Sequence, residues 1–100
     1  MFRHCVMLKF SDEATNAQKD QALEGIRNLP EHIEQIVSYS VGFNAGTRND
    51  NYDLAVVGDF ISKDDYEIYA EHPKHQEVIT VLLTPIIQDR KAIQYFVEEQ

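Results

Sequence analysis

Residues 2–10 alternate between two sets of side chains, and this run constrains the fold more than any other part of the chain. The first set is Phe2, His4, Val6, Leu8 and Phe10, and the second is Arg3, Cys5, Met7 and Lys9. Alternation with a period of two residues indicates a β-strand, because successive side chains of a strand point to opposite faces. Apolar residues occur in both sets, so we expect both faces of this strand to be covered.

Helical and strand patterns then follow in a defined order. Thr15 and Gln18 have the spacing of a capping box, and the apolar residues after them recur at helical spacing, which predicts a first helix over residues 16–29. Ser62 is expected to cap a second helix, which Pro73 interrupts. The other elements are expected as strands at residues 36–44, 52–61 and 88–97 and as a helix that restarts over residues 73–83.

This order of elements predicts an α+β fold. Two successive β-α-β halves give the ferredoxin-like β-α-β-β-α-β arrangement, in which helices cover one face of a four-stranded antiparallel sheet. We expect residues 1–100 to form a single domain of this kind. The second face of the sheet also carries apolar residues, and an uncovered apolar face of this extent indicates an interaction site. The sequence therefore predicts a homodimer that packs sheet against sheet.

Charge and composition narrow the classes of partner. Asp and Glu number 17 against 9 Lys and Arg, and the net charge of -8 argues against nucleic-acid and membrane partners. No apolar run approaches the roughly 20 residues needed to cross a bilayer. The single cysteine cannot form an internal disulfide and no signal-peptide pattern opens the chain, so a cytoplasmic location is expected. No phosphate-binding glycine motif is present, so no nucleotide cofactor is expected. A small molecule or another protein remains as the expected partner.

Residues 66–75 hold two tyrosines and two of the four histidines, an unusual density of side chains that can carry chemistry. If Pro73 is the first helical residue, His75 lies in the first turn, where the helix dipole favours the neutral imidazole that can act as a base. Tyr69 can donate its phenolic hydrogen to an oxygen that gains negative charge, and His4 can face the same space. Each residue also has a structural interpretation, as a helix cap or a core side chain. His72 and His75 are three residues apart, but Pro73 breaks the helix between them and no carboxylate is clearly spaced to help, so no metal site is expected.

A substrate site would need an apolar pocket between the sheet and the helices. We expect substrate contacts from Val6, Leu8, Ile26, Val56 and His72. A cavity of roughly 300 Å³ or more beside His4, Tyr69 and His75 would favour a small-molecule site, whereas a filled interior would favour structural roles for these side chains.

Three motifs make the chain similar to the stress-responsive dimeric α/β-barrel (Dabb) family. Residues 4–10 resemble the family's HxVxxKF strand, residues 69–75 its Y-x-x-HPxH signature, and residues 51–53 its GYD segment. The resemblance implies a dimer whose two sheets form a shared barrel. The family's cyclases, of the olivetolic acid cyclase type, work without a cofactor. The resemblance to them implies a histidine that acts as a base, a tyrosine that assists it, and a second histidine in the pocket. By motif position these roles fall on His75, Tyr69 and His4.

The chain departs from the cyclase pattern at two positions. Leu54 stands where the cyclase has a further histidine, and Gln94 stands where an aspartate is common. Three functions therefore stay open at the sequence level. The first is a cofactor-free lyase, cyclase or isomerase acting on a small apolar carbonyl or polyketide-like compound. The second is a non-catalytic, dimeric small-molecule-binding or stress-associated structural protein. The third is a cofactor-independent monooxygenase.

Overall fold

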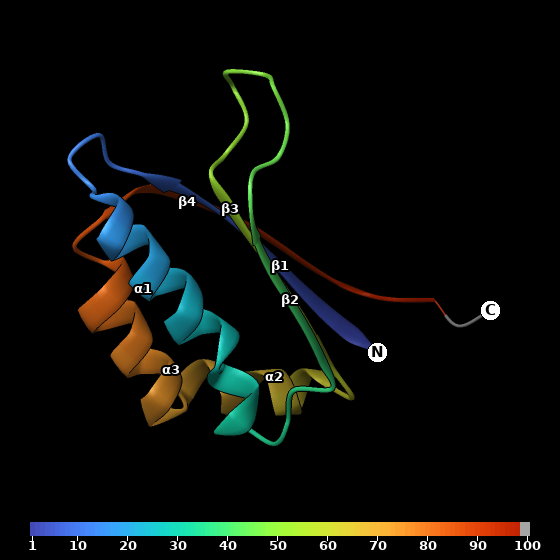
Figure 1. Ribbon diagram of the computed structural model, residues 1–100. Coiled ribbons are helices and arrows are strands. Elements are labelled where there is room, and N and C mark those ends of the chain that lie inside the picture. Colours follow the sequence, from blue (N-terminus) through green and yellow to red (C-terminus); the bar gives the residue numbers. More distant parts are fainter. Residues whose placement is uncertain (99–100) are drawn as a thin grey trace.

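A four-stranded antiparallel sheet carries all of the helices on one side (Figure 1). The computed structural model describes residues 1–98. The elements in chain order are β1 (Phe2–Phe10), α1 (Asn16–Arg27), β2 (Ser38–Phe43), β3 (Leu54–Phe60), α2 (Lys63–Glu71), α3 (Pro73–Glu77) and β4 (Ile87–Phe96). The strand order is β2-β3-β1-β4, which confirms the predicted α+β, ferredoxin-like class. None of the helices in the described part of the chain has the length and apolarity needed to span a membrane.

The first helix begins where the sequence predicts and ends two residues earlier. Thr15 and Gln18 form both hydrogen bonds of the capping box. The α-helix ends at Arg27 instead of Leu29, and a 3₁₀ turn, Leu29–Glu31, follows it. Pro30 lies in this turn and has no N–H to donate to a helical hydrogen bond, which accounts for the change of geometry.

The second helical region breaks at Pro73 as expected but continues with an unexpected geometry. His72 has extended backbone angles (φ −61°, ψ 134°), because the residue before a proline disfavours the helical region. After α3, residues Val78–Leu83 form a π-helix instead of the predicted α-helix. The N–H of Thr84 donates to the carbonyl oxygen of Ile79, five residues earlier, at 2.8 Å.

The strands are close to their expected positions, with shifted ends. β2 is shorter than the predicted segment 36–44 because the N–H of Ile36 still bonds the carbonyl oxygen of Ile33 in the preceding turn, at 3.3 Å. β3 is shorter than the predicted segment 52–61, and Ile61 lies beyond it with 71% of its surface exposed. β4 begins and ends one residue before the predicted segment 88–97.

The register of the strands aligns the helix-facing side chains in rows across the sheet. Three of these rows matter for the site. The histidine row is Tyr39, Gly58, His4 and Gln94, the valine row is Val41, Val56, Val6 and Ala92, and the arginine row is Phe43, Leu54, Leu8 and Arg90. Neighbouring rows are two residues apart along each strand, or about 7 Å. The side chains at the two ends of this surface are therefore separated by an aliphatic row.

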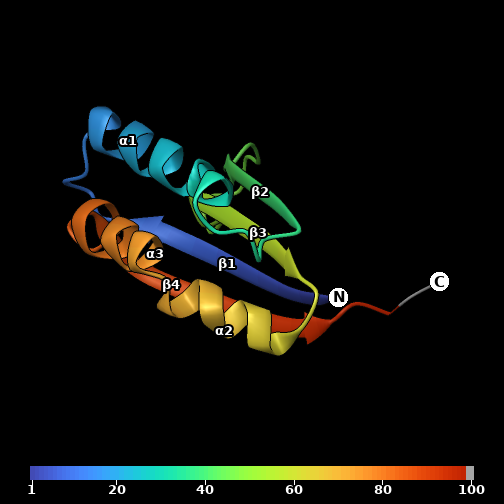
Figure 2. The ribbon, with the colours of Figure 1, turned by 90° about the horizontal axis from the view of Figure 1, so that it is seen from below.

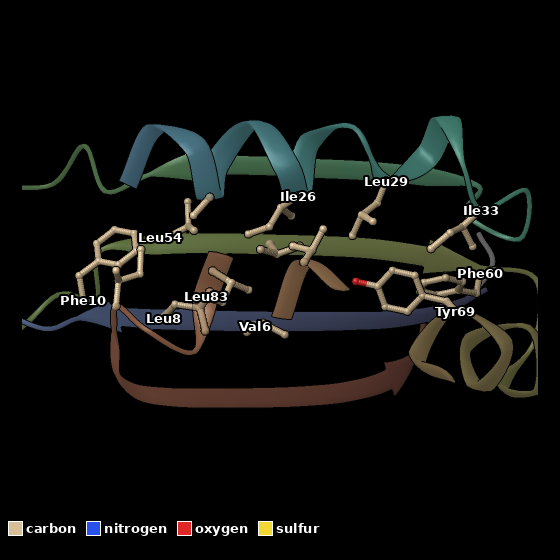
Figure 3. Packing of buried hydrophobic residues seen from close by; sticks show 14 of the residues in the cluster. Val6, Leu8, Phe10, Ile26, Leu29, Ile33, Leu54, Phe60, Tyr69 and Leu83 are labelled. Carbon is tan, nitrogen blue, oxygen red and sulfur yellow. The ribbon is translucent and has the colours of Figure 1, made fainter. Parts of the chain in front are cut away.

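The two faces of the sheet have different environments. On the helix-facing side, Val6, Leu8, Leu54 and Phe60 are buried against α1 and the segments around Tyr69 and Leu83 (Figure 3). On the other side no element of residues 1–98 covers the sheet, and large side chains are solvent-exposed there. Met7 is 47% exposed, Ile93 64% and Tyr95 43%. The open face is the one predicted to pack against a second copy.

Candidate active site

A cavity of about 320 Å³ lies between the sheet and the helices. Figure 2 shows β1 running between α1 on one side and α2 and α3 on the other. The cavity is lined by His4, Val6, Leu8, Ile26, Leu29, Tyr39, Val56, Tyr66, Tyr69, His75, Val78, Ile79, Leu83, Thr84, Ile87 and Arg90. Its volume exceeds the 300 Å³ that would favour a small-molecule site over a filled interior.

His75 is held with one ring nitrogen free. Its Nδ1 lies 3.1 Å from the carbonyl oxygen of Ala70, which can only accept a hydrogen bond, so Nδ1 carries the hydrogen and Nε2 keeps its lone pair. Burial lowers the pKa of His75, and the positive charge of Arg90 acts in the same direction; the bond to Ala70 opposes them. The side chain is therefore neutral at neutral pH, with an unprotonated nitrogen available as a base.

His4 has the opposite arrangement. Gln94 donates from its amide nitrogen to Nδ1 of His4 at 2.9 Å, so the hydrogen of the neutral imidazole lies on Nε2. Burial lowers the pKa of His4 to about 4, and the charges of Arg90 and His75 add to the effect. His4 is only 5% exposed. The cavity thus has one histidine that can accept a proton and another that can donate a hydrogen bond.

Tyr69 lies beside His75, with 4.3 Å between the ring centroids. Its hydroxyl points into the space between Ile26 and Val6 (Figure 3) and is 2.7 Å from the hydroxyl of Tyr39. Burial raises the pKa of Tyr69 to about 12 and raises that of Tyr39 further. Either hydroxyl can be the donor in this pair, and in one arrangement Tyr39 donates and Tyr69 accepts. The hydrogen of Tyr69 is then available to a ligand.

The structure brings together most of the side chains singled out from the sequence. His4, Tyr69 and His75 all line the cavity, together with Val6, Leu8, Ile26 and Val56. His72 does not, contrary to the expectation that it contacts substrate. Its Nδ1 accepts a hydrogen bond from the N–H of Lys74 at 3.1 Å and caps α3. A backbone cap keeps this ring at the helix end.

Three cavity features are absent from the sequence-based candidates. Tyr39 partners Tyr69, Gln94 orients His4, and Arg90 places a cation in the lining. The period-two pattern of β2 and β4 groups each of these residues by face. The pattern does not show which face of the sheet meets the helices, so the sequence alone does not place these three residues at the cavity. Among residues 1–98, no group of three or more His, Cys, Asp or Glu side chains is placed to hold a metal ion.

Comparisons with known proteins agree on the fold. The chain matches the family model Dabb, described as Stress responsive A/B Barrel Domain, over residues 2–97. A dimeric ferredoxin-like protein of unknown function from Thermobifida fusca YX is 30% identical, with a TM-score of 0.88 and coverage of 96% of this chain and 90% of that chain. A dimeric protein of unknown function from Bacteroides fragilis NCTC 9343 is 26% identical, with a TM-score of 0.82 and coverage of 94% and 93%.

A structure with a named activity also shares the fold. The hydroxynitrile lyase from Passiflora edulis is 20% identical, with a TM-score of 0.86 and coverage of 99% of this chain and 94% of that chain. The search among curated proteins gave no match.

Proposed function

Because the chain belongs to the stress responsive A/B barrel domain (Dabb) family, we propose that it is a cofactor-free lyase, cyclase or isomerase acting on a small carbonyl or polyketide-like compound. His75 is the base, Tyr69 donates a hydrogen bond to the developing oxyanion, and His4 orients the substrate. Val6, Leu8, Ile26 and Val56 contact its apolar part.

The chemical step is a proton transfer from carbon. Nε2 of His75 takes a proton from the carbon next to the carbonyl group, and the electrons of that C–H bond form the enolate. The negative charge then lies on the carbonyl oxygen, which accepts hydrogen bonds from the Tyr69 hydroxyl and from Nε2–H of His4. The protonated His75 then gives its proton to carbon in an isomerase, to the new alkoxide in a cyclase, or to the leaving group in a lyase.

The complementary protonation of the two histidines is the observation that carries this proposal. Ala70 holds the hydrogen of His75 away from Nε2, and Gln94 directs the hydrogen of His4 to Nε2. Burial keeps both rings neutral, so the base and the donor exist together at neutral pH. The Passiflora edulis protein offers further support, since a lyase activity occurs on this fold.

Deuterium exchange tests the proposed step without knowledge of the natural substrate. We expect the protein to accelerate exchange of the α-protons of phenylacetone, acetophenone and 4-benzoylbutyrate with D2O, as followed by proton NMR. A rate equal to that of buffer for every compound of this panel would refute the proposed base.

Removal of the Tyr69 hydroxyl should slow this exchange. We expect Tyr69→Phe to lose about 10²- to 10³-fold in rate, because one donor to the oxyanion is lost. Tyr39→Phe is the matched control, since it breaks the same hydroxyl pair but leaves the Tyr69 hydroxyl in place. It should lose less. Equal losses in the two variants would mean that the pair has a structural role.

A second copy of the chain is the proposed partner of the open sheet face. The similar proteins from Thermobifida fusca and Bacteroides fragilis are described as dimeric, and Met7, Ile93 and Tyr95 expose apolar surface on this face. We expect Ile93→Asp to convert the dimer to monomers in light scattering after size exclusion. Ile61→Asp introduces the same charge at an exposed isoleucine between β3 and α2 and should leave the dimer intact. A dimer in both variants would place the interface elsewhere.

A non-catalytic dimeric binding or stress-associated structural protein is the second candidate. The internal hydrogen bonds favour it, because Tyr69 and His75 already have partners in Tyr39 and Ala70. This function predicts no exchange and a large loss of stability when either side chain is removed.

A further inference from the structure

Arg90 brings a positive charge to the lining of the cavity. It pairs with Leu8 in the arginine row, so its side chain leaves β4 on the helix-facing side of the sheet. Leu8 and Leu54 of the same row are buried at 3% and 2% exposure. Arg90 lines the cavity at its rim and, on the edge strand, is solvent-exposed.

The guanidinium has no counter-ion in the part of the chain that the structure describes. None of the ion pairs among residues 1–98 involves Arg90, and none of the cavity-lining residues is Asp or Glu. The adjacent Asp89 points to the other face of the sheet, where it accepts from Tyr52 and lies 3.7 Å from Lys91. The positive charge therefore acts on the cavity without compensation from the lining.

This charge contrasts with the rest of the molecule. The net charge of the chain is -8, so most of its surface repels anions. The positive charge of Arg90 also acts on the far end of the cavity. Burial is the main cause of the lowered pKa of His4 and of His75, and the charge of Arg90 lowers both further. An anion that enters the cavity would pair with the positive charge of Arg90, which no acidic residue of the lining neutralises.

The rows of the sheet give the spacing of the polar groups. His4 lies in the histidine row and Arg90 in the arginine row, with the valine row between them. The two outer rows are about 13 Å apart at the Cα atoms, and an extended arginine side chain spans roughly half of that distance. A ligand that meets both ends has a polar group at each end and an aliphatic or aromatic segment between them.

We propose that the substrate of this site is a keto acid, whose carboxylate pairs with Arg90 while its carbonyl group lies at Tyr69 and His4 and its apolar segment crosses the valine row. This inference rests on the proposed function for the location of the carbonyl group. The planar guanidinium can bind a carboxylate through two parallel hydrogen bonds, which fixes the orientation of the ligand as well as its charge.

Calorimetric titration with two matched compounds tests the preference for an anion. The first probe is 4-benzoylbutyrate, which has a phenyl ketone and a carboxylate separated by three methylene groups. The second is its primary amide, which has the same shape and no charge. We expect the wild-type protein to bind the carboxylate at least about tenfold more tightly than the amide, as one charge-assisted contact would give.

Two charge-removing variants locate the cause of this preference. Arg90→Gln should bind both probes within about twofold of each other, with an unchanged melting temperature. Lys63→Gln removes the same charge from an exposed site outside the cavity and should keep the wild-type preference. Arg90→Lys keeps the positive charge and should keep part of the preference for the carboxylate over the amide.

The inference is overturned if the wild-type protein binds both probes equally, if it binds neither, or if Arg90→Gln keeps the preference. These results are separable from failure of the proposed function, because binding is measured without turnover. If the protein exchanges the protons of phenylacetone but shows no preference for the carboxylate, His75 remains the proposed base and only the keto acid is rejected as the substrate. A carboxylate preference without any exchange would leave the binding site and remove the catalytic step.

Discussion

His75→Gln is expected to lower the rate of α-proton exchange by about 10²- to 10⁴-fold while changing the melting temperature little. This is the usual contribution of a positioned general base. Glutamine can still donate from its amide nitrogen to the carbonyl oxygen of Ala70, so the local hydrogen bond has a replacement. It has no nitrogen that can take a proton at neutral pH. The exchange rate and a thermal unfolding curve, measured on the same sample, check both parts.

The matched control for this variant is His32→Gln. His32 is exposed and does not line the cavity, so its replacement should leave the exchange rate unchanged. A loss of exchange rate in both variants would show that the loss does not depend on the position of the histidine in the cavity. A large drop in the melting temperature of His75→Gln, with exchange retained in the folded fraction, would support the structural role instead.

The main architecture could be predicted because its signals are local. The alternation of residues 2–10 marks a strand, and the capping box at Thr15 and the proline at position 73 mark helix starts. These patterns depend on near neighbours in the chain. The order of the elements then leaves few ways to connect them in one sheet. The π-helix Val78–Leu83 was not predictable in this way, because the spacing of its apolar residues does not distinguish hydrogen bonds five residues apart from those of an α-helix.

The site could be predicted only for residues whose type and spacing are unusual. His75 and Tyr69 were found because two tyrosines and two histidines fall within residues 66–75. Tyr39 and Gln94 were missed because their roles depend on the register that puts them in one row with His4. The assignment of His72 to substrate had a similar cause, since the motif contains two histidines and does not show which one caps the helix.

Acid is expected to destabilise the fold through His4. Its pKa is about 4 in the folded protein and near 6.5 in the unfolded chain. Above pH 6.5 the ring is neutral in both states. As the pH falls from 6.5 to 4, the unfolded chain takes up the proton and the buried ring does not, so the free energy of unfolding decreases. The decrease from this residue reaches up to about 3 kcal/mol at pH 4. The lowered pKa of His75 acts in the same direction.

Urea unfolding between pH 7.5 and pH 4, at one protein concentration, measures this contribution by comparing the wild type with His4→Gln. The variant should be less stable than the wild type at pH 7.5, because it disturbs the contact with Gln94. It should also lose less stability on acidification, so the two curves converge towards pH 4. His75→Gln, measured in the same series, separates the smaller part that belongs to the second histidine. Parallel curves for wild type and His4→Gln would show that the buried ring takes up its proton as readily as the unfolded chain does. His4 would then carry a positive charge in the folded protein below about pH 6.5, where the proposed reaction needs the ring neutral.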